Sequence, residues 1–480
     1  MKKTIAILLL LCTLLGMLAA CKDDPETTED DTDEVETDGE KEHEDGLPNV
    51  DMNGFELNIM TYDDDWFTWA ETTIAPEGSY SGNVLYEEMF ERNAYIEERF
   101  NCFLNVSTQT NITNTHIQNW VLGDDEVHDI VMFYDKWVLD SAAYFRDFAD
   151  LEYVDLTQDY WNPSVTQMFK INGTQIAASG SFSLGMLSRT MATVFNKEIY
   201  SSRFGDVSTM YALVDNNEWT IEKLYQLGAE VLVSQDDVWN DQDQYGISAS
   251  KKTLYTALMV GSGVQFIQKG EDGIPQFKLA GDAAALDKLQ KILTLNQGNN
   301  IYYDTSNDPN FATPEWFFEE EHTLFGFRVL KDIPRARAMM EAEFGIVPVP
   351  KYDSDQKEYY SICAGGDVAC LMKNVSEDRL ENIGILLEAL AYDSEQNLIP
   401  LYKIDLLKTR YASDPDSSAM LDIVFDTAYS DIGVNIMEDG VSLYLIKNVY
   451  VPGKDTLSSH LAVMEMGIPD LIATKIKNIK

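Results

Sequence analysis

Residues 83–106, NVLYEEMFERNAYIEERFNCFLNV, place a helix pattern directly ahead of a strand pattern. The apolar side chains that share one helical face are Leu85, Met89, Ile96 and Phe100. This spacing predicts an amphipathic helix, because residues three, four or seven positions apart lie on the same side of a helix. The following FLNV, at 103–106, is predicted to be a strand. A helix that can cover a strand in this way is typical of an α/β protein.

Strand and helix patterns alternate on both sides of this stretch. FELNIM at 55–60 alternates apolar and polar residues, and DIVMFY at 129–134 is predicted to be a buried strand. Further on, Thr220 and Ser376 are each expected to cap the start of a helix. Strands that alternate with helices predict a largely parallel sheet covered on both faces. A chain with about 430 ordered residues is expected to form two lobes rather than one.

The first residues have the pattern of a secretory signal. Two lysines precede an apolar run, Ile5 to Leu15, that is too short to span a bilayer comfortably, and LAAC at 18–21 closes it. This ending resembles the lipobox of bacterial lipoproteins, whereas a plain signal peptide needs no cysteine after the cut. The resemblance implies a signal peptide at 1–20 and a mature chain that begins at a palmitate-carrying Cys21. Such a chain is anchored on the extracytoplasmic face of the cell membrane.

The chain is strongly acidic, with 35 Lys and Arg against 81 Asp and Glu and a formal charge of −46. Residues 22–46 hold 14 acidic residues and two lysines, so we expect a disordered tether, placed at 21–50. Nucleic-acid binding is disfavoured, because phosphate contacts need clustered Lys and Arg. The acidic surface also argues against a polyanionic ligand.

Five cysteines do not predict a disulfide framework. Cys12 belongs to the signal and Cys21 is the lipid site. Cys102, Cys363 and Cys370 remain, an odd number in a chain large enough to fold without disulfides. Three small buried thiols are therefore expected, and a bond between Cys363 and Cys370 is the alternative.

The order of several motifs resembles that of the extracellular solute-binding proteins of bacterial ATP-binding-cassette importers. The resemblance is to family 1, which includes maltose- and oligosaccharide-binding proteins. Its clearest motifs are the strand DIVMFYDKWVLD, the Phe-Asn-Lys at 195–197, the helix start EWTIEKL and the strand EFGIVPVPKYD. The matching segments are 123–140, 148–161, 171–200, 218–224, 244–248, 317–330, 343–353 and 364–375. Beyond Ala391 the resemblance fades.

The resemblance implies a two-lobed, periplasmic-binding-protein-like α/β fold of class II, the Venus-flytrap type, with a ligand cleft between the lobes. The expected N-terminal lobe comprises 51–183 and 326–364, and the C-terminal lobe comprises 184–325 and 365–480. Closure around the ligand is a hinge motion in the crossing segments. Glycines on the matched crossings could absorb the backbone changes, with ordinary turns as the alternative. They are Gly180, Gly185, Gly326, Gly365 and Gly366.

Candidate ligand-binding residues follow from the segments that face the cleft in this family. Sugars are bound by aromatic faces and by planar polar side chains, which supply hydrogen bonds to hydroxyls. The candidates are Tyr62, Asp63, Asp65, Trp66, Tyr134, Asp135, Trp137, Ser181, Ser183, Tyr255, Phe327, Arg328 and Asp367. Core packing is the alternative for Trp137 and Tyr255, a hinge role for the two serines, and an ion pair with a nearby acid for Arg328.

The function that follows is capture of a carbohydrate, most simply an oligosaccharide, and its delivery to the permease subunits of an importer. No catalytic residue, cofactor or metal is expected, and the protein is expected to be a monomer. A calcium site at residues 63–65 or near Asp304 is a remaining alternative. The rival function is a surface glycan hydrolase, or a glycan-capture lipoprotein without a transporter. A glycosidase needs two carboxylates at a set separation, which 81 acidic residues could supply.

Overall fold

The computed structural model describes residues 45–63, 74, 84–123, 128–234, 236, 238–295, 299–307, 314–404, 407, 414–448 and 457–479. Leu47–Lys480 is one compact unit and contains every element discussed below. The predicted signal peptide, Cys21, Asp65 and Trp66 lie outside the described residues. The tether was expected to reach residue 50, which is wrong at its end, because Leu47 is buried and Val50 packs against the core.

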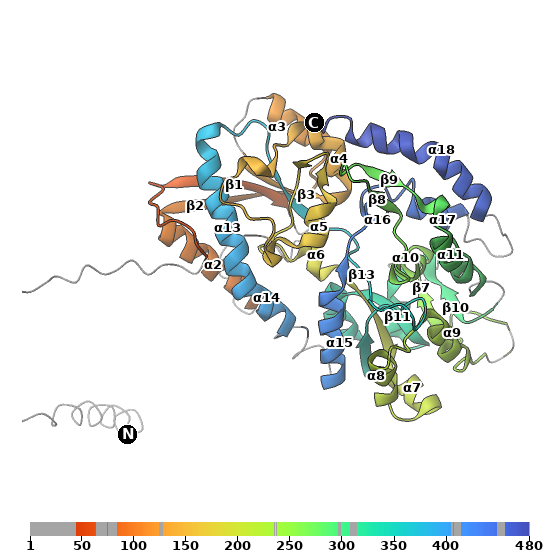
Figure 1. The fold of residues 1–480 in the computed structure, drawn as a ribbon. Coiled ribbons are helices and arrows are strands. Elements are labelled where there is room, and N and C mark those ends of the chain that lie inside the picture. The colour runs from red at the N-terminus through yellow and green to blue at the C-terminus, as the bar shows by residue number, and fades with distance from the viewer. Residues whose placement is uncertain are drawn as a thin grey trace, which may run out of the picture. The chain divides into compact units, whose positions relative to one another are not determined.

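The first sheet has four strands among the described residues, in the order β14-β3-β1-β2 (Figure 1). They are β1 (Phe55–Tyr62), β2 (Cys102–Gln109), β3 (Ile130–Tyr134) and β14 (Asp367–Leu371). β1 is parallel to β2 and β3, as the sequence predicts, whereas β14 is antiparallel to β3. The predicted helix is α2 (Val84–Phe100), and it buries Met89, Ile96 and Phe100. Its fourth predicted core residue, Leu85, is only partly buried.

The second sheet has five strands in the described part of the chain, in the order β10-β7-β11-β6-β12. They are β6 (Met191–Asn196), β7 (Tyr245–Ala249), β10 (Tyr302–Asp304), β11 (Thr323–Val329) and β12 (Phe344–Val347). β7 is parallel to β10 and β11, and β6 is antiparallel to β11 and β12. Every residue of β6, β7 and β12 is buried, so this sheet is covered on both faces.

Helices and short strand pairs surround the two sheets. The helices are α3 (Asn114–Leu122), α4 (Val138–Ser141), α5 (Pro163–Met168), α6 (Gly185–Ser188), α7 (Lys197–Phe204), α8 (Ser208–Asp215), α9 (Ile221–Ala229), α10 (Lys251–Gly261), α11 (Ala283–Leu295), α12 (Ile333–Met339), α13 (Leu380–Gln396), α14 (Leu398–Pro400), α15 (Pro415–Asp426), α16 (Ile432–Asn435), α17 (Ser442–Asn448) and α18 (Leu457–Ile476). The pairs are β4 (Lys170–Ile171) with β5 (Thr174–Gln175), β8 (Ile267–Lys269) with β9 (Pro275–Phe277), and β13 (Ser361–Ile362) with β15 (Ala428–Tyr429). None of the described helices is both long and apolar enough to cross a bilayer.

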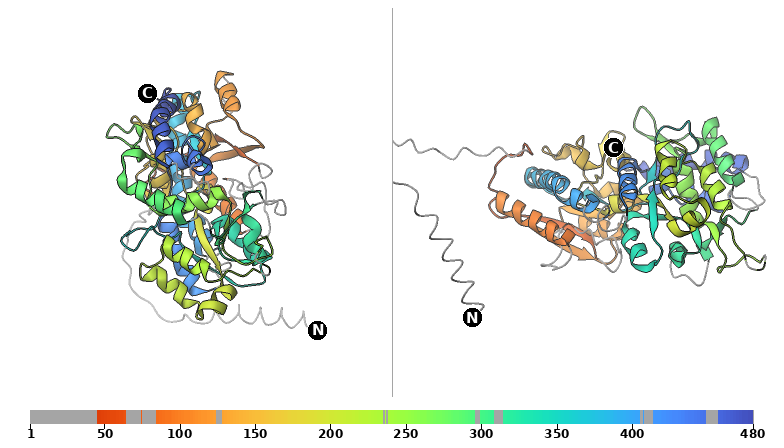
Figure 2. Two further views of the ribbon diagram at one scale, coloured as in Figure 1. Left: turned by 90° about the vertical axis from the view of Figure 1, so that its right-hand side faces the viewer. Right: turned by 90° about the horizontal axis from the view of Figure 1, so that it is seen from below.

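The two sheets lie in separate lobes, with α2 and α13 beside the first sheet and α9 and α10 beside the second (Figures 1 and 2). The predicted lobe boundaries are wrong for the later strands. β11 and β12 pair with β6 in the second sheet, so 326–364 does not belong to the first lobe. β14 pairs with β3 and α13 packs on α2, so the chain returns to the first lobe at residue 367. Gly326 accordingly lies inside β11 and not on a crossing segment.

The C-terminal helix α18 contacts both lobes. It packs against β9 and the turn Leu279–Gly281 of the second lobe, and against α4 of the first (Figure 1). Lys475 forms an ion pair with Asp140 in α4 at 2.6 Å. α18 also contains Pro469 in its interior.

The two predicted helix caps have different outcomes. The Thr220 side chain accepts a hydrogen bond from the Lys223 N–H at 3.2 Å, so the predicted cap of α9 is confirmed. Ser376 makes no such bond, because the short turn Glu377–Arg379 precedes α13.

The prediction of three buried thiols is confirmed, since Cys102, Cys363 and Cys370 are all free and buried.

The contact between α9 and β7 depends on two glycines. A Cβ on Gly246 of β7 would lie 2.5 Å from the Gly228 Cα of α9. We expect Gly246→Ala to lower the free energy of unfolding by about 2 kcal/mol or more, because backbone cannot move aside cheaply. Gly281→Ala is the control, because a Cβ there meets nothing within 4 Å, and it should change stability by about 0.5 kcal/mol at most. Urea unfolding of both variants tests this, and equal losses would contradict it.

Candidate ligand-binding site

A cavity of about 620 Å³ lies between the two lobes, where segments cross from one to the other. Its lining residues are Tyr134, Arg189, Met191, Lys252, Thr253, Thr256, Phe327, Val329, Lys331, Asp332, Arg335, Ala364, Gly365, Val434, Asn435 and Glu438. This volume is within the usual range for small-molecule sites, about 300–1,000 Å³. The lining mixes apolar, hydroxyl, amide and charged groups, which suits a polar organic ligand.

The first lobe contributes Tyr134, the last residue of β3. Its ring packs edge-on against Trp137, with ring centroids 5.2 Å apart. Burial raises the pKa of the Tyr134 hydroxyl, so it stays protonated near neutral pH and can both donate and accept hydrogen bonds. This position follows the general rule that ligands bind beyond the carboxyl ends of the strands.

The second lobe contributes β11 and α10. Phe327 and Val329 line the cavity from β11, while Arg328 between them does not, because successive side chains of a strand point to opposite faces. α10 contributes Thr253 and Thr256, which are three residues apart and therefore share one helical face.

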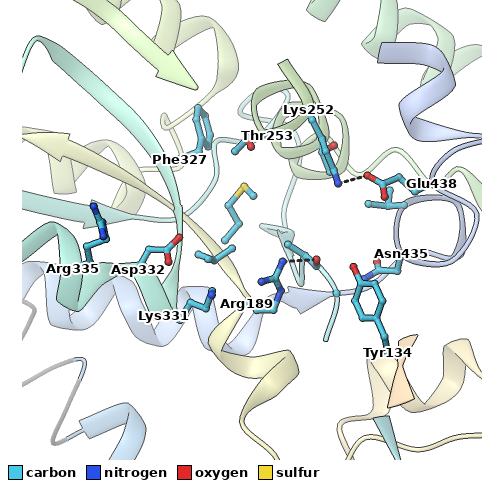
Figure 3. Close-up of a pocket in the computed structure, with 16 residues that line it drawn as sticks. Tyr134, Arg189, Lys252, Thr253, Phe327, Lys331, Asp332, Arg335, Asn435 and Glu438 are labelled. Atoms are coloured by element: carbon cyan, nitrogen blue, oxygen red, sulfur yellow. Dashed lines mark hydrogen bonds and ion pairs between the residues drawn. The ribbon is translucent and has the colours of Figure 1, made fainter. Parts of the chain in front are cut away.

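Charged side chains line the cavity on more than one side. In Figure 3, Lys331, Asp332 and Arg335 lie on one side, Glu438 lies on the other, and Arg189 lies between them. Lys252 also lines the cavity and pairs with Glu438. Lys136, from the turn after β3, contacts Glu438 at 3.2 Å.

Asp135 is buried directly behind this lining. The Asn435 side-chain amide donates to the Asp135 carboxylate at 3.2 Å and to the Cys363 carbonyl at 2.9 Å. Asn435 therefore connects the end of β3 with the segment that crosses between the lobes. Burial raises the pKa of the Asp135 carboxyl to about 7.

Gly365 lies on the same crossing segment and has a φ of +89°, a conformation that side chains other than glycine rarely adopt. Its neighbour Ala364 accepts a hydrogen bond from Arg189 at 3.2 Å, which links the first and second crossing segments. The prediction that Gly365 lies on a crossing is confirmed.

Of the candidates that the structure describes, Tyr134 and Phe327 line the cavity. Trp137 packs against Tyr134, and Asp135 is fully buried, so neither of these two lines it. That Tyr134 and Phe327 contact a ligand stays a prediction. The side chain of Asp135 is covered by Asn435, so its position supports an indirect role in ligand binding.

Three further candidates lie outside the cavity lining: Ser181 and Ser183 on the first crossing, and Asp367 in β14. The Ser183 hydroxyl donates to the Asp367 carboxylate at 3.1 Å, and burial raises the pKa of Asp367. Gly185 packs so closely on Asp367 that a Cβ there would collide with the carboxylate. Ser181 donates to Glu395 at 2.5 Å. These contacts connect the crossing segment to β14 and α13, which fits the hinge alternative.

Three other candidates do not line the cavity: Arg328 and Tyr255 are buried away from it, and Tyr62 is buried beside Tyr134, whose backbone N–H donates to the Tyr62 hydroxyl at 3.3 Å. Arg328 pairs with Glu319, and both side chains are only 1% exposed. Tyr255 is 4% exposed and belongs to the core of the second lobe. The Tyr62 hydroxyl is 3.2 Å from the Ile112 carbonyl, to which it donates. Asp63, which does not line the cavity either, accepts from Thr110 at 2.5 Å.

The sequence reasoning missed the charged part of the lining. Lys331 and Arg335 follow β11 directly and are one helical turn apart, in a run of four basic residues within 328–337 of a very acidic chain. That local reversal of charge was a usable signal. Thr253 and Thr256 line the cavity from the same helix as the predicted Tyr255. The prediction was therefore correct for the helix and wrong for the helical face. No pattern indicated Asn435 or Glu438, which lie beyond the part of the chain that carried the family resemblance.

In the described part of the chain, no group of three or more His, Cys, Asp and Glu side chains is placed to hold a metal ion. Of the two calcium alternatives, residues 64 and 65 lie outside that part, while Asp304 pairs with Lys251 at 2.9 Å.

Comparisons with known proteins concern the fold. No protein-family model matches the sequence. No curated protein matches it either. Solved structures do match: UspC of M. tuberculosis, with a TM-score of 0.56 and 10% identity, covers 86% of this chain and 98% of its own.

Two further matches carry the names of their ligands. The cyclic alpha-maltosyl-1,6-maltose binding protein of Arthrobacter globiformis has a TM-score of 0.53 and 12% identity, over 89% of this chain and 98% of that one. A cyclo/maltodextrin-binding protein complexed with maltotetraose has a TM-score of 0.54 and 12% identity, over 88% and 98%. The chain therefore has the two-lobed, periplasmic-binding-protein-like α/β fold that the sequence predicts.

Proposed function

We propose that this chain is the extracytoplasmic solute-binding component of an ATP-binding-cassette importer, anchored to the membrane through lipid on Cys21, and that it captures an oligosaccharide. The observation that carries the proposal is the cavity between the lobes, which the crossing segments line together with β3, β11 and α10. Two solved structures of the same fold are oligosaccharide-binding proteins, which supports a saccharide as the ligand.

The cavity offers the groups that a saccharide needs. Tyr134 and Phe327 provide aromatic surface for the C–H faces of a sugar ring. Thr253, Thr256 and Asn435 provide partners for hydroxyl groups, and discrimination follows because a buried polar group left unpaired is costly. The two lobes contribute different parts of this set, so a ligand that contacts both stabilises the closed arrangement by its extra contacts there.

Ligand binding without turnover is the expected behaviour. A bound saccharide at 100 times its dissociation constant should stabilise the protein by about 2.7 kcal/mol and raise its melting temperature. A thermal-shift screen across oligosaccharides measures the shift, and chromatography of the same mixtures detects any product. Product formation would favour the glycan hydrolase instead. The absence of a shift with every saccharide tried would contradict carbohydrate binding.

Transport function has its own test. The purified importer in vesicles should accumulate the saccharide only when this protein is present. If the saccharide binds but uptake does not depend on the protein, the chain is a glycan-capture lipoprotein.

A further inference from the structure

The lining of the cavity carries a charge opposite to that of the whole chain. Among the described residues of the lining, Arg189, Lys252, Lys331 and Arg335 give four positive charges and Asp332 and Glu438 give two negative ones, a sum of +2. The chain as a whole has 35 basic and 81 acidic residues, a charge of −46. Four basic residues at one cavity are therefore far more than the composition of this chain would place there by chance.

The basic side chains lie on segments whose positions the fold determines. Arg189 lies between α6 and β6, where the chain crosses between the lobes, and it donates to the Ala364 carbonyl of the other crossing segment. Lys331 and Arg335 are both half-buried, one in the turn Leu330–Asp332 after β11 and the other in α12. Figure 3 shows Lys331 and Arg335 on one side of the cavity, with Asp332 between them, and Arg189 nearer its middle.

We propose that the solute is an acidic saccharide, whose carboxylate or sulfate group is bound by Arg189, Lys331 and Arg335. This inference rests on the proposed capture of a saccharide and specifies its chemical class. The neutral part of the sugar lies against Tyr134 and Phe327, and its hydroxyl groups face Asn435 and the threonines of α10.

The physical reason is the cost of covering cations. Closure around a neutral sugar removes water from a lining with a surplus of positive charge and adds no anion, whereas an anionic group on the ligand compensates for that loss. Arginine is suited to this role, because its planar fork of N–H donors matches the geometry of a carboxylate or sulfate. Burial lowers the pKa of Arg189, but an arginine side chain remains charged in proteins.

The acidic body of the protein limits how many charges the ligand can carry. At physiological ionic strength, exposed charges more than about 8 Å apart are largely screened, so the acidic outer surface acts only weakly on a single acidic group inside the cavity. A long polyanion would extend past the lining toward the acidic surface and be repelled. A short saccharide with one or a few acidic groups fits both conditions.

The test compares saccharides that differ only in charge. Oligogalacturonates and oligoglucuronates of two to four units are each paired with their carboxyl-reduced neutral counterparts, and sulfated galactose oligomers with their desulfated forms. Isothermal titration should show the acidic member of at least one pair binding tenfold or more tighter than its neutral partner. This preference should shrink when NaCl rises from 20 to 300 mM. Preference within the uronate pairs identifies a carboxylate, and preference within the sulfated pairs identifies a sulfate.

Variants identify which basic residues produce the preference for the acidic ligand. Lys331→Gln with Arg335→Gln should weaken the acidic ligand at least tenfold and change a neutral ligand much less, and Arg335→Lys should retain most of the preference. Arg203→Gln is the matched control, because Arg203 pairs with Glu230 on the exposed surface of the second lobe. Melting temperatures without ligand establish that each variant is folded.

The outcomes separate this inference from the proposed function. Equal binding of acidic and neutral partners, or an unchanged preference in the double variant, overturns the acidic class while saccharide capture stands. No binding by any saccharide, acidic or neutral, overturns both. An acidic preference that the double variant abolishes and the Arg203→Gln control retains supports both.

Discussion

Replacing Arg328 by methionine is expected to lower the free energy of unfolding by about 3–5 kcal/mol. Its guanidinium donates to both oxygens of Glu319, at 3.1 and 2.5 Å, and to the Phe327 carbonyl at 2.8 Å. Both side chains are 1% exposed, so loss of the arginine leaves a carboxylate buried without its cation. Urea unfolding of the variant measures the loss.

The double variant Arg328→Met with Glu319→Leu distinguishes the lost pair from lost packing. Because it removes both charges, it should recover most of the stability that the single variant loses. Arg203→Met, at an exposed ion pair, is the control and should cost less than about 1 kcal/mol. A double variant no more stable than the single variant would show that packing, and not the buried charge, accounts for the loss.

Asp135→Asn is expected to stabilise the protein at pH 8 and to have a much smaller effect at pH 5. The pKa of Asp135 is about 7 in the folded protein, against 3.8 for an ordinary aspartate, because the carboxyl is buried. Between these values the unfolded chain releases the proton and the folded protein keeps it. The contribution of Asp135 to stability is therefore complete below pH 3.8 and is lost as the pH rises through 7.

The expected size follows from the pKa difference. Each pKa unit corresponds to 1.36 kcal/mol, so the advantage of the asparagine should grow by about 3 kcal/mol between pH 5 and pH 8. Thermal and urea unfolding of the variant and the wild type at both pH values measure it. The charged and titratable groups that act on Asp135 or face it are Arg189, Tyr134 and Cys363, and all three are unchanged in the variant. A stability difference that does not vary with pH would contradict this assignment.

Local patterns in the sequence were sufficient for the secondary structure and the class of fold. Apolar periodicity located β1, α2 and β3, and a single threonine marked the start of α9. These features depend on neighbours within a few residues, so the sequence states them directly. The division into lobes cannot be seen in such local patterns, because it depends on which distant strands pair. β14 pairs with β3 from more than 230 residues further along the chain, and no local signal specifies that partner.

The candidate site was predictable in outline only. The end of β3, the segment around Gly365 and the strand β11, all of which the sequence suggested, line the cavity. Within β11, however, the chemistry of Arg328 suggests a ligand contact, whereas the alternation of a strand puts Phe327 toward the cavity and Arg328 in the interior. The general lesson is that residue type indicates what a side chain could do, whereas the face on which it lies depends on long-range pairing.

The C-terminal helix has a consequence for motion. α18 contacts α4 of one lobe, where Lys475 forms its ion pair, and the turn Leu279–Gly281 of the other lobe. Any rotation of one lobe against the other must therefore also displace or bend this helix. Pro469 lacks the N–H that would complete the ladder of backbone bonds, so bending there costs least. The stiffness of α18 would thus help to set how far the two lobes open, independently of any solute.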